Sequence, residues 1–199
     1  MPFLAVGMVF HGQAEAQTSK ADVLTFTDPD GTLIPVDERE VVGSATLKRR
    51  DIGLEIEVHT TDLGAGNAYT NWWIVFNNPE ACEDGCGADD LPRAGVEASV
   101  LHATGRVADA GGEATFRAFL PVGLILLNRT EDGRERQRLG PGLQNPRTAE
   151  IHYIIRNHGP VAGDTPAEIL EKIGTFFGGC DGFLCFDEQS IAFPLPNRN

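Results

Sequence analysis

The chain has 199 residues, 41% of them hydrophobic, and a formal net charge of −13. This length suits one domain with a sizeable core, and no apolar run approaches the roughly 18 residues that a transmembrane helix needs. The excess of carboxylates repels phosphate backbones, so the composition speaks against a nucleic-acid-binding protein.

The first residues have the pattern of an export signal. An apolar segment, Phe3–Phe10, is followed by the small-x-small sequence Ala14-Glu15-Ala16, which predicts a signal peptide over residues 1–16 with cleavage after Ala16. The usual basic region is missing, so the signal either has a minimal basic region or starts upstream, and a buried first strand is the alternative. We therefore expect a secreted or periplasmic protein with a single β domain over residues 21–199.

The next part of the chain changes from turns to strands. Residues 21–37 are predicted to form a short, turn-rich segment, because Asp28-Pro29-Asp30-Gly31 is a strong turn sequence. Strands are predicted at Val41–Leu47 and Leu54–His59. The second alternates apolar with acidic or histidine side chains, which is typical of an antiparallel strand with one solvated face.

The stretch 68–79 holds both tryptophans and predicts a central strand. Aromatic and β-branched residues dominate it, and Asn-Asn-Pro ends it. Alternation predicts that its wholly apolar face belongs to the core. That face carries Trp72, Ile74 and Phe76. Trp73 falls on the opposite face with Tyr69 and Asn71, where it is either covered by a helix or loop or forms an exposed aromatic platform for a ligand.

The remaining pattern completes a mainly β fold. Further strands are predicted at Val96–Thr104, Glu113–Leu120, Ile151–Asn157 and Ile191–Pro194. Between the last two, Thr165, Pro166 and Glu168 occupy the N-cap, first and third positions of a short helix that ends near Gly174. About eight strands and one helix over 166–174 predict an antiparallel β-sandwich or barrel-like domain.

A locally basic stretch, Arg129–Arg147, shows neither a strand nor a helix period. A loop of this length is often functional. It is either a solvated loop whose charges pair within the protein or a lid or anionic-ligand site. In the second interpretation Arg134 and Arg136 contact the ligand.

Four cysteines form two close pairs, Cys82 with Cys86 and Cys180 with Cys185. Three connectivities are possible, and the short spacing favours two local disulfides, each worth about 2 kcal/mol. A four-cysteine zinc site is the alternative, although paired zinc ligands usually have two intervening residues. Disulfides and export support each other.

Metal chemistry is the second candidate activity. Histidines on neighbouring strands can converge on copper or zinc, and the candidates are His59, His102, His152 and His158. The alternative is that these histidines are separate. No Gly-x-Ser-x-Gly nucleophile motif is present.

The leading hypothesis is a non-enzymatic exported domain without a cofactor. It binds a small ligand or another protein, and the candidate contacts are Tyr69, Asn71, Trp73, Arg134 and Arg136. The alternative is a copper or zinc protein or metalloenzyme that uses the four histidines.

Several stretches resemble a group of exported bacterial proteins without assigned function. They are Tyr69–Cys82, Ser99–Gly105, Glu150–Pro160 and Gly178–Cys180, and the resemblance covers most of residues 40–193. It implies a shared fold and export, and no known activity. His158-Gly159-Pro160 after a histidine-bearing strand is also similar to the chordin-type extracellular β domain, but the rest of that family's pattern is absent.

Overall fold

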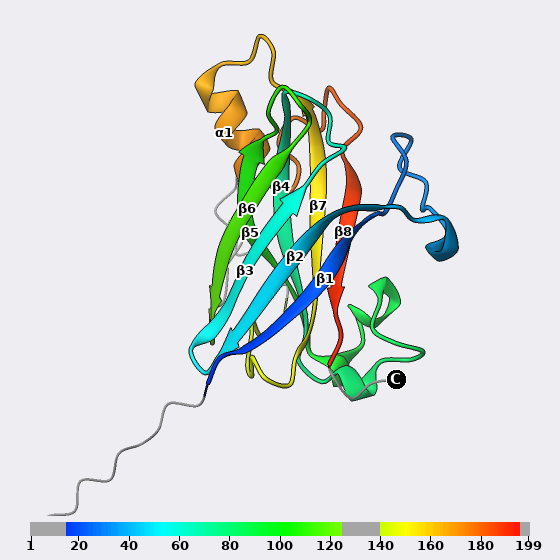
Figure 1. Ribbon diagram of the computed structural model, residues 1–199, viewed down its shortest axis with the longest axis vertical. Coiled ribbons are helices and arrows are strands. Elements are labelled where there is room, and N and C mark those ends of the chain that lie inside the picture. The colour runs from blue at the N-terminus through cyan, green and yellow to red at the C-terminus, as the bar shows by residue number, and fades with distance from the viewer. Residues whose placement is uncertain (1–14, 125–139, 196–199) are drawn as a thin grey trace, which may run out of the picture.

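The computed structural model describes residues 15–124 and 140–195 and shows one curled antiparallel sheet (Figure 1). Its eight strands follow the order β5-β4-β7-β8-β1-β2-β3-β6. The edge strands β5 and β6 also touch, so the sheet forms a nearly closed barrel. The strands are β1 Gln17–Thr25, β2 Val41–Arg50, β3 Gly53–Thr60, β4 Asn67–Phe76, β5 Ala98–Val107, β6 Ala114–Pro121, β7 Glu150–Pro160 and β8 Phe186–Phe193. The predicted fold class is confirmed, in its barrel-like form.

Strand β1 was not expected from the sequence. Thr18, Lys20 and Asp22 are exposed, and Val23 is the one buried apolar side chain of this strand. The strand exists because it pairs along its whole length with β2 and at its end with β8. The first described strand therefore starts at Gln17, upstream of residue 21, where the β domain was expected to start.

Inside the barrel, strand β4 presents the face opposite to the one predicted to form the core. Trp73 is 1% exposed, belongs to the core cluster inside the barrel, and packs edge-to-face on Tyr153 with the ring centroids 5.0 Å apart. Trp72 is also buried, but on the outer side, against the rings of His102 and Phe176. Both faces of this central strand are covered, so alternation alone could not identify the inner one.

The predicted helix is confirmed as α1, Pro166–Gly174. Thr165 and Glu168 cap it reciprocally, with the Glu168 backbone N–H donating to the Thr165 hydroxyl and the Glu168 carboxylate accepting from the Thr165 N–H. The helix lies outside the barrel against β4 and β5 (Figure 1). It therefore covers the outer face, where Trp72 lies, and not Trp73.

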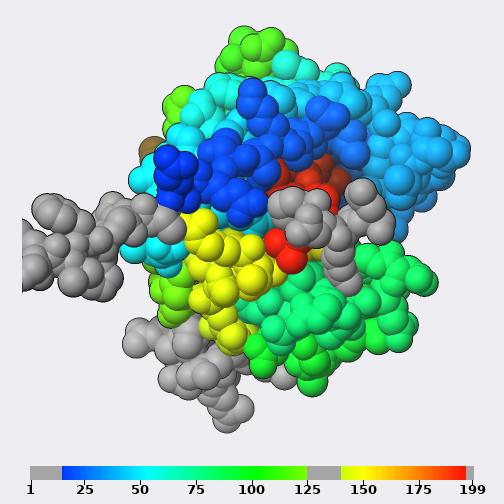
Figure 2. Space-filling model, turned by 60° about the horizontal axis from the view of Figure 1, so that its bottom comes forward, coloured from blue at the N-terminus to red at the C-terminus, as the bar shows by residue number. Residues whose placement is uncertain are grey.

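One end of the barrel is closed by the β4–β5 connection, residues 77–97, which lies beside residues 140–149 (Figure 2). The Asn77 amide donates to the Gly142 carbonyl at 2.8 Å, and the Gln144 N–H donates to the Asn77 oxygen at 2.9 Å. The guanidinium of buried Arg49 donates to the Ala149 carbonyl at 2.7 Å. Arg134 and Arg136, the candidate ligand contacts in this region, lie outside the described residues.

Two local disulfides, Cys82–Cys86 and Cys180–Cys185, close short loops. This confirms the predicted pairing over the four-cysteine zinc site. In the described ranges, no helix combines the length and apolar character needed to cross a membrane. The disulfides are consistent with folding in an oxidising compartment.

Candidate functional site

The four candidate histidines have separate surroundings. His59 contacts Glu57 and Thr115, and His152 contacts Glu150. His102 contacts the Ile173 carbonyl, and His158 contacts Thr70 and the Gly178 carbonyl. Among residues 15–124 and 140–195, the one group of three or more close potential metal ligands is His158 with Cys180 and Cys185. In the part of the chain that the structure describes, the four histidines therefore have different hydrogen-bond partners and form no ligand group with one another.

His158 is fully buried near the end of β7 and belongs to a chain of hydrogen bonds. The Trp72 indole N–H donates to Thr70 Oγ1 at 2.8 Å. Thr70 Oγ1 lies 2.7 Å from His158 Nε2, and His158 Nδ1 lies 2.7 Å from the Gly178 carbonyl oxygen. A carbonyl only accepts, so Nδ1 carries the proton and Nε2 accepts from Thr70. Burial lowers the pKa of His158, which keeps the imidazole neutral.

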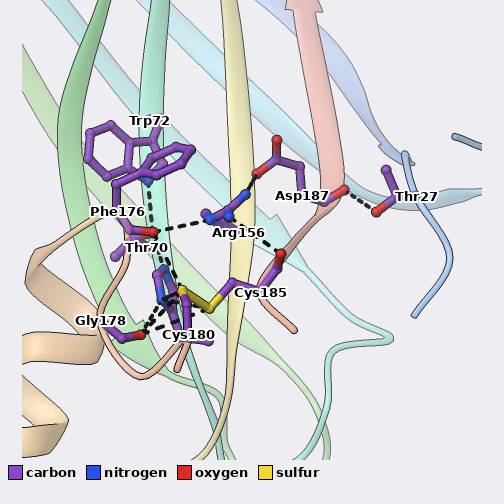
Figure 3. A network of polar contacts seen from close by, with 10 residues as sticks. Thr27, Thr70, Trp72, Arg156, Phe176, Gly178, Cys180, Cys185 and Asp187 are labelled. Carbon is purple, nitrogen blue, oxygen red and sulfur yellow. Dashed lines mark hydrogen bonds and ion pairs between the residues drawn. A yellow bond between two sulfur atoms is a disulfide. The ribbon is translucent and has the colours of Figure 1, made fainter. Parts of the chain in front are cut away.

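Arg156 ties the segment that carries the second disulfide to the barrel (Figure 3). Its guanidinium donates to Asp187 at 2.7 Å, to the Phe176 carbonyl at 3.3 Å and to the Cys185 carbonyl at 3.4 Å. It also lies over the Phe176 ring, 4.2 Å from the centroid. The segment between α1 and β8, which lies over Trp72 and His158, is therefore held in place by Arg156 of β7 as well as by its own Cys180–Cys185 disulfide.

The predicted aromatic platform is wrong, because its residues line the filled interior of the barrel. Tyr69, Asn71 and Trp73 are each at most 1% exposed. Tyr69 instead belongs to a polar network in which its hydroxyl donates to Glu188 at 3.0 Å and Asn157 donates to the same carboxylate at 2.6 Å. Burial raises the pKa of Glu188. An acidic residue among other polar residues of the last strand gave no sign of this network in the sequence.

The outer surface of β2, β3 and β6 forms a depression of about 680 Å³. Strand pairing arranges its side chains in three rows that each cross the three strands. The rows are Ser44–His59–Thr115, Thr46–Glu57–Arg117 and Lys48–Glu55–Phe119. A second depression of about 500 Å³ shares Ser44 and His59 with the first. We call the surface formed by these three rows the outer groove.

The middle of the outer groove is fixed by hydrogen bonds around Glu57. Arg117 donates to the Glu57 carboxylate at 2.7 Å, and His59 Nε2 lies 2.8 Å from the same oxygen. His59 Nδ1 lies 3.0 Å from the Thr115 hydroxyl. The hydrogen bonds from Arg117 and then His59 lower the pKa of Glu57 to about 2. The carboxylate therefore stays ionised at every physiological pH.

The outer groove is polar, electrically balanced and open. Lys48 and Arg117 offset Glu55 and Glu57, so its formal charge is zero with a neutral His59, in a chain whose net charge is −13. Phe119 adds an apolar ring that is 50% exposed. The sequence showed that Glu55, Glu57 and His59 point outward. It did not show that β6 lies beside them, because β3 and β6 are distant in the chain.

The chain matches no protein-family model and none of the curated proteins. The resemblance to exported bacterial proteins and to the chordin-type domain therefore stays a prediction.

Proposed function

We propose that this protein is an exported, non-enzymatic binding domain that holds an uncharged polar chain, such as a neutral polysaccharide, in the outer groove. The observation that carries the proposal is the groove itself: three rows of mostly polar side chains on the outer face of the barrel. No cofactor takes part in this binding.

The position of the ligand follows from packing. Aromatic and aliphatic side chains fill the barrel, with Trp73 and Tyr153 in contact at its centre. A ligand must then bind outside. A small molecule is usually buried in a deep, mostly apolar pocket, whereas the outer groove is shallow and polar, which suits a chain that lies across the strands.

The chemistry of the ligand follows from the lining. Lys48 and Arg117 offer N–H donors, and Glu55 and Glu57 offer acceptors, which matches the hydroxyl groups of a sugar. A strongly charged ligand would find no excess of opposite charge, because Lys48 and Arg117 offset Glu55 and Glu57. The exposed ring of Phe119 supplies an apolar surface for the C–H face of a sugar ring.

Export is supported by the apolar segment and small-x-small sequence at the start of the chain. The two disulfides agree with an oxidising compartment. Both features fit a domain that meets polysaccharides outside the cytoplasm.

Affinity electrophoresis tests the proposal. We expect a gel that contains one of several neutral polysaccharides (dextran, starch, xylan, glucomannan or mixed-linkage glucan) to retard the wild-type protein, and Phe119→Ser to lose most of the retardation. Phe177→Ser is the matched control, because Phe177 is also an exposed phenylalanine, at 66%, outside the groove. Equal mobility in all gels, or equal retardation of both variants, contradicts the proposal.

A further inference from the structure

Three potential ligand atoms converge where the second disulfide meets the end of β7. His158 Nδ1 lies 3.9 Å from Cys180 Sγ and 3.6 Å from Cys185 Sγ, and all three atoms lie within 4.8 Å of one another. In a tetrahedral zinc site with bonds of about 2.3 Å to sulfur and 2.0 Å to nitrogen, nitrogen and sulfur ligands are about 3.5 Å apart. The imidazole is therefore already at the distance that a shared ion requires.

The hydrogen bonds around His158 supply the support that a metal-bound imidazole needs. A ligating histidine donates its other N–H to a nearby acceptor, which orients the ring. Thr70 Oγ1 is 2.7 Å from Nε2, and it has lone pairs for both this N–H and the Trp72 indole N–H. Release of the Gly178 carbonyl by Nδ1 then needs a change of tautomer, with the N–H moving to Nε2, and a rotation of the Thr70 hydroxyl so that its hydrogen no longer points at Nε2.

We propose that His158, Cys180 and Cys185 form a redox-gated site for a thiophilic metal ion such as zinc. The inference is independent of the outer groove, which lies on other strands. In the oxidised protein the sulfurs bind each other and the imidazole donates to Gly178. In the reduced protein two thiolates and one neutral imidazole surround one position, and soft sulfur ligands favour zinc or cuprous copper.

The gating reaction balances with a dithiol as reductant. Two electrons and two protons pass to the Cys180–Cys185 disulfide as the two thiols of the reductant become a disulfide. Binding of a divalent ion then releases the two thiol protons, and the imidazole keeps its overall charge. Both cysteines are only partly buried, so a reductant can reach them.

The segment between the helix and β8 keeps its attachment when the disulfide opens. Arg156 donates to the carbonyl of Phe176, which precedes Cys180, and to the carbonyl of Cys185 itself. These contacts do not depend on the sulfur–sulfur bond. They hold the two thiols near His158, which lowers the entropic cost of closing a ring around the ion.

Cobalt binding to the whole protein tests the proposal directly. After reduction with a phosphine, which is oxidised to the phosphine oxide with oxygen from water, Co²⁺ is added without oxygen. We expect one ion per chain, with thiolate-to-cobalt charge-transfer absorption and the visible bands of tetrahedral cobalt, displaced by zinc. The oxidised protein shows neither. Nitrogen NMR of the imidazole then shows the N–H moved from Nδ1 to Nε2 of His158.

Matched variants assign the ligands. The double variant Cys82→Ser, Cys86→Ser keeps the full signal, and Cys180→Ser, Cys185→Ser loses it. We expect His158→Gln to weaken cobalt binding at least about tenfold, and Thr70→Val to weaken it about ten- to a hundredfold through the lost support. His102→Gln, which changes the other histidine beside Trp72, leaves the affinity unchanged.

Three results overturn the proposal. The first is a folded, reduced protein that binds no cobalt or zinc. The second is equal cobalt binding by the oxidised protein or by His158→Gln. The third is a circular dichroism spectrum that shows the reduced chain unfolded both without and with cobalt.

Discussion

Thr70 lies between two buried nitrogen atoms, one of which donates a hydrogen bond to it while the other accepts one from it. Its oxygen accepts from the Trp72 indole N–H, and its own hydroxyl hydrogen is directed to His158 Nε2. We expect Thr70→Val, which keeps the shape and removes both bonds, to lower the free energy of unfolding by about 1–3 kcal/mol.

Urea denaturation measures this change. The matched control is Thr18→Val, on the exposed side of β1, which should change stability by less than about 0.5 kcal/mol. Equal stability of Thr70→Val and wild type contradicts the hydrogen-bond assignment.

Glu188 predicts a pH dependence. Burial raises its pKa above the ordinary 4.5, so the native state favours the protonated form more than the unfolded state does. The stability that this contributes is present below pH 4.5 and is lost as pH rises through the folded pKa. Glu188→Gln should therefore gain stability relative to wild type as pH rises from 4 toward 7, because the amide carries no charge.

Thermal unfolding across this pH range checks the result. Glu80→Gln, at an exposed carboxylate, serves as the control. A constant difference between Glu188→Gln and wild type at all pH values is the contradictory outcome.

Residue roles were the hardest feature to predict from the sequence. Cysteine pairing followed from spacing, because Cys82–Cys86 and Cys180–Cys185 are close in the chain. The environment of His158 could not be predicted from spacing, because its partners Thr70 and Gly178 are 88 and 20 residues away. Local pattern carries no information about such contacts.

At the scale of elements, the helix and seven of the eight strands could be predicted from their own residues. The capping residues Thr165 and Glu168 predicted α1 correctly. Strand β1 has few apolar residues and owes its conformation to pairing with β2. The inner face of β4 was predicted wrongly, because tertiary packing covers both of its sides.

Helix α1 approaches β5 closely at Gly105. A Cβ added to Gly105 would collide with the backbone of Ile173, in the last turn of the helix. We expect Gly105→Ala to displace α1 while the barrel stays folded. Hydrogen exchange should show faster exchange in residues 166–174, and the indole N–H resonance of Trp72 should shift.

The control for this substitution is Gly87→Ala, since a Cβ at Gly87 meets nothing within 4 Å. Unchanged protection of α1 in Gly105→Ala contradicts the packing described for this helix.

At the scale of the whole molecule, the number of strands and the turn sequences predicted the fold class. They did not decide whether the sheet closes into a barrel. Antiparallel pairing brings β6 beside β3, and the contact between β5 and β6 closes the sheet around side chains such as Trp73 and Tyr153. The outer groove on β2, β3 and β6 is the surface that we propose for recognition. A balanced groove on an otherwise acidic protein agrees with an uncharged ligand.

Amide NMR of the wild-type protein is the most direct test of where the ligand binds. A mixture of short neutral oligosaccharides of glucose, xylose and mannose is titrated into labelled protein. The account predicts shifts that concentrate in β2, β3 and β6, around Glu57, His59 and Arg117. Shifts that concentrate at α1 or at the ends of the barrel, or no shifts at all, contradict a neutral polysaccharide as the ligand of the outer groove.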